Sequence, residues 1–150
     1  MKMHIEALSN YRLAYIRRVG PYGSTNIQAM ETLKNWAKEK NLLTSSAVIF
    51  GIAQDNPETT PPEDCRYDVC IVISKDYPLD NSLEEGKLAG GTYAIYKVEH
   101  TAEAIQKAWA AIFPSIKNSG YKMDNKPILE RYTVQMVEAG YCELCVPVFS

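Results

Sequence analysis

Several classes of protein are excluded by what this 150-residue chain lacks. It has no run of roughly 18 or more apolar residues and no basic segment followed by an apolar one. We therefore expect a cytoplasmic protein with neither a membrane span nor an export signal. Basic and acidic residues number 16 and 18 and are spread evenly, which argues against direct nucleic-acid binding. A phosphate loop, a dinucleotide glycine fingerprint and a Gly-x-Ser-x-Gly elbow are also absent, and no cofactor is expected.

Cysteine and histidine are scarce, with four and two residues in the whole chain. Cys142 and Cys145 have a spacing that suits zinc, but a strand sends residues three apart to opposite faces. We therefore expect buried structural cysteines and no metal site, with zinc as the alternative. His4 and His100 lie far apart and away from any candidate nucleophile, so we interpret both as surface or capping residues.

The second half of the chain repeats the first within a single predicted domain, residues 1–150. Residues 68–73 resemble residues 143–148 at an offset of 75, and residues 16–19 resemble residues 95–98 at an offset of 79. The two pseudo-repeats cover about 1–75 and 88–150. Each has the pattern strand, helix, strand, strand, which predicts an α+β fold with antiparallel sheets, two helices and a central ligand cleft between the copies.

Apolar spacing indicates where the helices and strands lie. One predicted helix places these residues on one face: Ile27, Met30, Leu33 and Trp36 or Ala37. A second, capped by Thr101, does so with Ile105, Trp109, Ile112, Phe113 and Ile116. Pro114 lies inside it and should kink or shorten it. Strands are expected over residues 13–19, 47–53, 66–74, 92–98, 127–135 and 143–149, with a polar connector over 76–88.

Glu130 is the main candidate for a functional side chain. Alternation along its predicted strand places Ile128, Glu130, Tyr132 and Val134 on one face. If that face lines the cleft, a partly buried carboxylate would favour a cationic ligand or act as a base with a raised pKa. The alternative is a solvated residue on an exposed sheet face, or an ion pair with a nearby lysine.

Aromatic residues near the predicted strands and on one helix form the second candidate feature. They are Tyr22, Phe50, Tyr67, Tyr93, Trp109, Phe113, Tyr132 and Tyr141. Aromatic walls with one carboxylate suit a delocalised organic cation, through stacking and cation–π contact. The alternative is ordinary core packing, which we expect for Trp36 and for at least half of the others.

Four segments together resemble a known family, the GyrI-like small-molecule-binding domain. They are residues 55–61 (DNPETTP), 65–68 (CRYD), 90–94 (GGTYA) and 126–132 (KPILERY). The same domain forms the effector-binding half of many AraC-type and some MerR-type regulators, and it occurs alone in SbmC-like proteins. The resemblance covers about residues 13–148. It implies a tandem repeat of the strand-helix-strand-strand unit called SHS2.

The resemblance also implies roles for individual residues. The glutamate at the position of Glu130 would face the cleft and meet cationic aromatic drugs, and positions matching Tyr22, Tyr67, Trp109 and Tyr132 would line it. Some stand-alone members resemble this chain and hydrolyse cyclopropane-bearing DNA-alkylating compounds with the same glutamate. This chain departs from the pattern at Pro114, and it has no helix-turn-helix segment.

The sequence is therefore compatible with three functions. The first is a receptor or sequestering protein for amphipathic, cationic aromatic small molecules, or the effector domain of a regulator. The second is a small hydrolase of reactive electrophiles with Glu130 as general base, which ranks lower because no partner carboxylate or histidine lies at a defined spacing. The third is a protein-interaction role, with DNA gyrase or a fused DNA-binding domain as partner.

Overall fold

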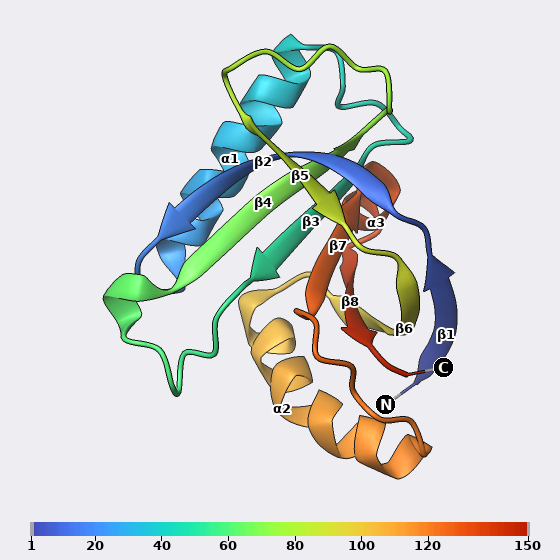
Figure 1. The fold of residues 1–150 in the computed structure, drawn as a ribbon. Helices are drawn as coiled ribbons and strands as arrows, with labels where there is room; N and C mark the ends of the chain where they lie inside the picture. The colour runs from blue at the N-terminus through green and yellow to red at the C-terminus, as the bar shows by residue number, and fades with distance from the viewer. Residues whose placement is uncertain (1, 150) are drawn as a thin grey trace.

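Eight antiparallel strands form a single curled sheet in the computed structural model, which describes residues 2–149 apart from the side chains of residues 24 and 25. Three helices accompany the sheet (Figure 1). The strands are β1 (Met3–Leu8), β2 (Tyr11–Val19), β3 (Val48–Ala53), β4 (Arg66–Ile73), β5 (Glu84–Leu88), β6 (Gly91–Glu99), β7 (Leu129–Thr133) and β8 (Tyr141–Pro147). The helices are α1 (Ser24–Glu39), α2 (Ala102–Ser119) and α3 (Val134–Glu138), and a 3-10 turn covers Pro62–Asp64. The predicted α+β repeat of strand-helix-strand-strand units is confirmed.

The order of the strands shows how the two units join. It runs β1-β6-β8-β7-β3-β4-β2-β5, so β7 of the second unit pairs with β3 of the first at the centre of the sheet. The outer strands are exchanged between units. Strand β1 precedes the first unit but pairs with β6, whereas β5 precedes the second unit but pairs with β2. The halves are therefore tied together at the central strand pair and at both edges.

The register of the strands corrects one part of the repeat alignment. Ile16 pairs with Val69, and Tyr96 pairs with Leu144. Val69 and Leu144 are related by the offset of 75, so the counterpart of Ile16 is Tyr96, at an offset of 80 rather than 79. A slip of one residue moves a side chain to the other face of a sheet, so the offset decides which residues share the helix-covered face.

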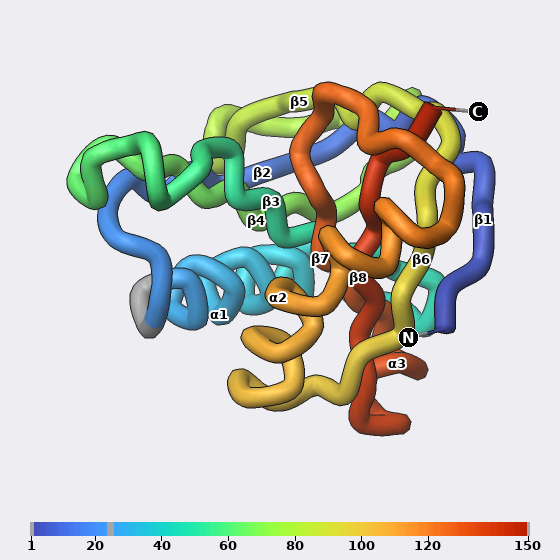
Figure 2. Tube along the Cα trace, turned by 90° about the horizontal axis from the view of Figure 1, so that it is seen from below, coloured from blue at the N-terminus to red at the C-terminus, as the bar shows by residue number. Residues whose placement is uncertain are grey.

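Helices α1 and α2 cover the same face of the sheet, one on each unit (Figure 2). The stripe of α1 that packs on the sheet consists of Ala29, Leu33 and Ala37, and that of α2 consists of Ala108, Ile112 and Ile116. These stripes differ from the single wide faces that apolar spacing predicts. A second stripe on each helix, which includes Ile27 on α1 and Phe113 on α2, remains exposed beside the first.

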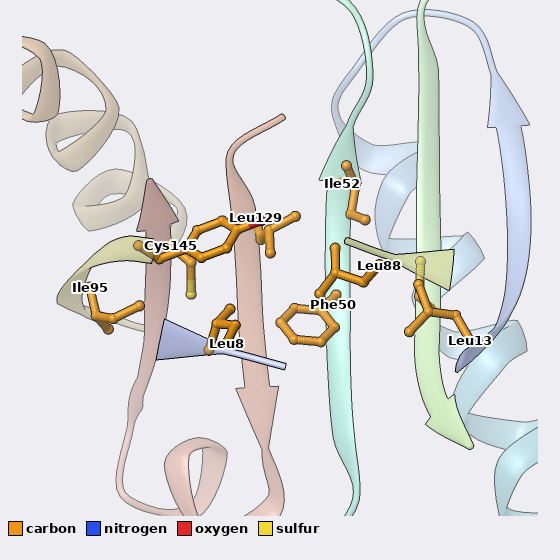
Figure 3. Close-up of a cluster of buried hydrophobic side chains, with 10 residues drawn as sticks. Leu8, Leu13, Phe50, Ile52, Leu88, Ile95, Leu129 and Cys145 are labelled. Atoms are coloured by element: carbon orange, nitrogen blue, oxygen red, sulfur yellow. The ribbon is translucent and has the colours of Figure 1, made fainter. Parts of the chain in front are cut away.

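The opposite face of the sheet curls around a core of its own, to which no helix contributes (Figure 3). Its ten buried residues are Leu8, Leu13, Phe50, Ile52, Cys70, Leu88, Tyr93, Ile95, Leu129 and Cys145. Every strand from β1 to β8 contributes at least one of these residues, so this core holds both units together. The helix-covered face shares none of its buried residues with this core.

Several elements differ from the sequence prediction, among them a third helix where two were expected. Strand β1 and strand β5 were not expected, and β5 occupies part of the segment predicted to be a connector. The strand expected to reach residue 135 ends at Thr133, whose side chain accepts a hydrogen bond from the Met136 amide (3.1 Å) and starts α3. Pro114 does not shorten α2, which continues to Ser119. No helix within the described residues is long and apolar enough to cross a membrane.

Candidate functional site

A cleft lies between α1 and α2 on the helix-covered face of the sheet, and it has two lobes. The helix lobe, about 390 Å³, is lined by α1 and the start of α2, with Ile27, Met30, Glu31, Lys34, His100 and Ile105 among its residues. The loop lobe, about 740 Å³, lies beside the loop that follows β3, with Tyr22, Asp55, Glu58, Trp109, Phe113, Asp124 and Lys126 among its residues. Asn26, Tyr67 and Glu130 line both lobes.

The carboxylate of Glu130 is held between two tyrosine hydroxyls at this junction. The Tyr67 hydroxyl donates a hydrogen bond to Oε1 (3.1 Å), and the Tyr132 hydroxyl donates one to Oε2 (2.8 Å). Tyr132 lies two residues further along β7 on the same face, whereas Tyr67 comes from β4 in the other unit. Each carboxylate oxygen therefore has one fixed donor, and the pair of donors spans the boundary between the repeats.

Gly51 makes this arrangement possible. It pairs with Glu130 across β3 and β7, and with Val69 across β3 and β4. A Cβ atom at Gly51 would lie 2.2 Å from the Tyr67 hydroxyl oxygen and 3.4 Å from Oε1 of Glu130. The Tyr67 ring can cross over β3 and reach Glu130 only because no side chain stands there.

Burial raises the pKa of Glu130 above its ordinary value of 4.5, and the two tyrosine hydrogen bonds, which favour the charged form, offset this only in part. Among the described residues no basic side chain pairs with Glu130. Its neighbour Arg131 points to the other face, where it binds Glu6 and Glu143. Burial also raises the pKa of both tyrosines, with Glu130 adding to the effect, so their hydroxyls remain protonated donors.

Aromatic rings form the walls of the loop lobe. The Tyr22 ring meets the Tyr67 ring edge-on, with centroids 6.3 Å apart, and its hydroxyl donates to the Arg66 carbonyl (2.8 Å). Across the lobe, Trp109 and Phe113 lie one turn apart on α2, and the Phe113 side chain is 50% exposed. Exposed aromatic surface beside a fixed carboxylate is a feature of ligand sites rather than of core packing.

Carboxylates dominate the charge of the loop lobe. Asp55, Glu58, Asp124 and Glu130 line it with one lysine, Lys126. Arg66 donates two side-chain hydrogen bonds and one backbone hydrogen bond to Asp55, which lower the pKa of that carboxyl to about 2. Lys126 Nζ lies 3.6 Å from Oδ2 of Asp124. Glu58 and Glu130 keep no basic partner among the described side chains. The lobe therefore carries a negative bias.

The helix lobe is more aliphatic. Ile27, Met30 and Ile105 face it, and Ile27 is 65% exposed. His100 also lines the lobe, and its ring centroid lies 5.3 Å from that of Tyr132. Sequence reasoning treated His100 as an ordinary surface or capping residue. It missed Gly51 entirely, because the need for a glycine there depends on a tyrosine 16 positions away.

The structure brings five of the predicted ligand-binding aromatics to the cleft, namely Tyr22, Tyr67, Trp109, Phe113 and Tyr132. It does not bring Phe50, Tyr93 or Tyr141 there. Phe50 and Tyr93 are buried in the core on the opposite face. Their neighbours along the same strands, Gly51 and Ala94, face the helices. Tyr141 packs under Lys97, whose Nζ lies 4.2 Å from the ring centroid. Parity along each strand places all three away from Glu130.

The four cysteines are buried and form no disulfide. Cys142 packs in the core beneath α2, whereas Cys145 packs in the core of the opposite face, which confirms that the two point in opposite directions. Burial, reinforced by the charge of Glu130, raises the pKa of Cys142 to about 12. Within residues 2–149 no group of three or more histidine, cysteine or acidic side chains is arranged to hold a metal ion.

Known proteins are similar to this chain in sequence or in fold. The chain is 44% identical over 149 residues to YosT of Bacillus subtilis strain 168, an SPbeta prophage-derived protein named as a transcriptional regulator, with 99% of each chain covered. It is 28% identical over 148 residues to the DNA gyrase inhibitor of Escherichia coli strain K12, covering 96% of this chain and 93% of that protein.

Solved structures with the same fold include one domain of a DNA-bound protein and one ligand complex. The C-terminal domain of EcmrR matches with a TM-score of 0.77 and 13% identity, over 99% of this chain and 98% of that one. In the EcmrR–DNA complex, the chain spans 57% of the EcmrR chain. SAV2435 bound to tetraphenylphosphonium matches with a TM-score of 0.65 and 16% identity, over 100% and 95%.

A family model identifies the family to which this chain belongs. The model, described as the GyrI-like small molecule binding domain, matches residues 1–148. At 44% identity YosT is related over the whole length of the chain, and the structural matches agree with its fold. The chain belongs to the GyrI-like small-molecule-binding domain family.

Proposed function

We propose that the cleft binds amphipathic, aromatic cations and that Glu130 provides the charge that recognises them. One observation carries this proposal: the Glu130 carboxylate is fixed by Tyr67 and Tyr132 at the junction of the two lobes, with no basic partner among the described residues. A half-buried carboxylate without a counter-ion gains from a cation that replaces the lost water.

The walls of the cleft support the same class of ligand. Tyr22, Trp109 and Phe113 offer flat apolar surface, and aromatic faces attract organic cations. The unpaired Glu58 adds to the negative bias of the loop lobe. A protein of the same fold, SAV2435, has been solved with tetraphenylphosphonium bound, which is an aromatic cation.

A thermal-shift screen tests the ligand class. Purified protein is heated with cationic dyes, neutral aromatics and anionic metabolites, and the screen is repeated on Glu130→Gln and on Glu103→Gln. The latter makes the same change at an exposed residue of α2, whose side chain is 79% exposed. Stabilisation by cations in the wild type and in Glu103→Gln, but not in Glu130→Gln, supports the proposal. Equal stabilisation of all three proteins by every class would refute it.

The biological role that we infer is that of a receptor, either one that acts alone and sequesters its ligand or one that serves as the effector domain of a transcription regulator. Support comes from the relatives named as transcriptional regulators and from the fold shared with the C-terminal domain of EcmrR, which has been solved in complex with DNA. A protein partner such as DNA gyrase or a fused DNA-binding domain is supported only by the names of relatives. Pull-down of purified gyrase by this protein, with and without a cation, separates the two roles.

Hydrolysis of a reactive electrophile is the second candidate, favoured by one observation. The raised pKa of Glu130 would suit a general base, and the hydroxyls of Tyr67 and Tyr132 lie within reach of a leaving group beside it. Turnover of a cyclopropane-bearing alkylating substrate by the wild type, with none by Glu130→Gln, would establish this activity. Binding without turnover would leave the receptor as the function.

A further inference from the structure

The position of Glu130 between the lobes limits the shape of a suitable ligand. Asn26, Tyr67 and Glu130 line both the helix lobe and the loop lobe, so the carboxylate lies where the two meet. A cation with its charge at one end could fill only one lobe while it contacts Glu130. A cation with its charge between two arms could make the same contact and fill both lobes.

The lobes also differ in chemistry. Side chains that line only the helix lobe include the aliphatic residues Ile27 and Ile105 and the flexible Met30, all on α1 or α2. The rings of His100 and Tyr132 also line this lobe. Those that line only the loop lobe include the aromatic rings of Tyr22, Trp109 and Phe113. On α2 the change occurs within one turn, from Ile105 to Trp109. Aliphatic walls suit a flexible alkyl chain, whereas flat rings gain additional energy from stacking on another ring.

We propose that the cleft selects cations whose charged nitrogen lies between an alkyl arm and an aromatic arm, with the alkyl arm in the helix lobe and the aromatic arm in the loop lobe. This inference rests on the proposed function, since it requires the contact between the cation and Glu130. It adds the shape of the ligand and its direction in the cleft. The loop lobe has the larger volume, about 740 Å³ against about 390 Å³ for the helix lobe, so the wider space receives the ring system.

Three quaternary ammonium ions differ only in their arms and test this selection by calorimetric titration. Benzyldimethylhexylammonium has both arms, benzyltrimethylammonium has only the aromatic arm, and hexyltrimethylammonium has only the alkyl arm. We expect the ion with two arms to bind the wild type about tenfold or more tightly than either of the others, because each arm buries apolar surface in its own lobe.

Two matched variants test the direction of the ligand. Ile27→Ser and Phe113→Ser each remove an exposed apolar side chain, one from each lobe, and Ile5→Ser does the same on β1, outside the cleft. Ile27→Ser should lose several-fold more affinity for the two ions that carry a hexyl arm than for benzyltrimethylammonium. Phe113→Ser should show the reverse preference for the benzyl arm, and Ile5→Ser should behave as the wild type.

The possible results distinguish a failure of the two-arm inference from a failure of the proposed cation binding. If the three ions bind the wild type equally well and Glu130→Gln weakens all of them, cation recognition stands and the two-arm inference fails. It fails as well if Ile27→Ser and Phe113→Ser weaken all three ions alike. If none of the ions binds the wild type, the proposed function and the inference are both overturned.

Discussion

Gly51 and Glu130 face each other across the central strand pair, and they occupy corresponding places in the two repeats. Gly51 pairs with Val69, Glu130 pairs with Leu144, and Val69 and Leu144 are repeat counterparts. At the boundary of the two units, one copy therefore carries a carboxylate and the other carries no side chain. The symmetric scaffold thus holds a single charge, with space beside it for the Tyr67 hydroxyl.

Replacement of Gly51 by alanine should disturb Tyr67 more than the backbone. The new Cβ would lie 2.2 Å from the Tyr67 hydroxyl oxygen, so the ring must shift and its hydrogen bond to Glu130 is lost. We expect Gly51→Ala to lower the free energy of unfolding by about 1–3 kcal/mol, as overpacking usually does. Urea unfolding measures this change. In the Tyr67→Phe background the same substitution should cost clearly less, and an equal cost would show that the hydroxyl is not what clashes.

Stability should depend on pH through Glu130. Because the pKa of Glu130 is raised in the folded state, the folded protein keeps a proton that the unfolded chain releases as the pH rises above about 4.5. The contribution of Glu130 to stability is therefore greatest below that value and is lost as the pH rises through the folded pKa. The difference in unfolding free energy between the wild type and Glu130→Gln, followed over pH by urea unfolding, should show this fall. A difference that stays constant with pH contradicts the raised pKa.

Asp68 should contribute to stability from the opposite face of the sheet. It is 4% exposed, and Arg17 binds both of its oxygens at 2.8 Å, while Gln54 donates to one of them at 3.0 Å. Asp68→Ala should destabilise the fold on the order of 2 kcal/mol, less than for a fully buried pair because the Arg17 side chain is 38% exposed.

The exposed pair of Glu103 and Lys107 provides the control for that experiment. Both side chains are more than three-quarters exposed, and such pairs contribute little. Thermal or urea unfolding of Glu103→Ala should match the wild type. If Asp68→Ala is equally harmless, the bonds from Arg17 and Gln54 do not stabilise the sheet.

Local periodicity predicted much of the site, because period-two alternation is a property of a single strand. It placed Ile128, Glu130 and Tyr132 on one face, and all three line the cleft or pack beneath its helices. It could not tell which face of another strand would meet Glu130. Phe50 was therefore predicted as a ligand-binding residue, although its neighbour Gly51 is the residue beside Glu130.

Features that depend on distant pairing were harder to predict. Strand β5 is rich in charged residues and gains its structure from pairing with β2, so its sequence resembles a polar connector. On α2, apolar spacing merged two stripes into one face. Ile112 packs on the sheet, whereas Phe113 is half exposed toward the loop lobe. The sheet decides which stripe is buried, and the helix sequence alone does not contain that information.

Recognition of a cation by the charge of Glu130 is tested most directly by a pair of matched titrations. Tetraphenylphosphonium and the neutral triphenylphosphine oxide are titrated calorimetrically into the wild type, Glu130→Gln and Glu103→Gln. We expect Glu130→Gln to lose about 1–2 kcal/mol of binding free energy for the cation and to bind the neutral compound as the wild type does. Glu103→Gln should match the wild type for both. Equal losses for the two compounds in Glu130→Gln, or no loss for the cation, would contradict the assignment of Glu130 as the charge that recognises the ligand.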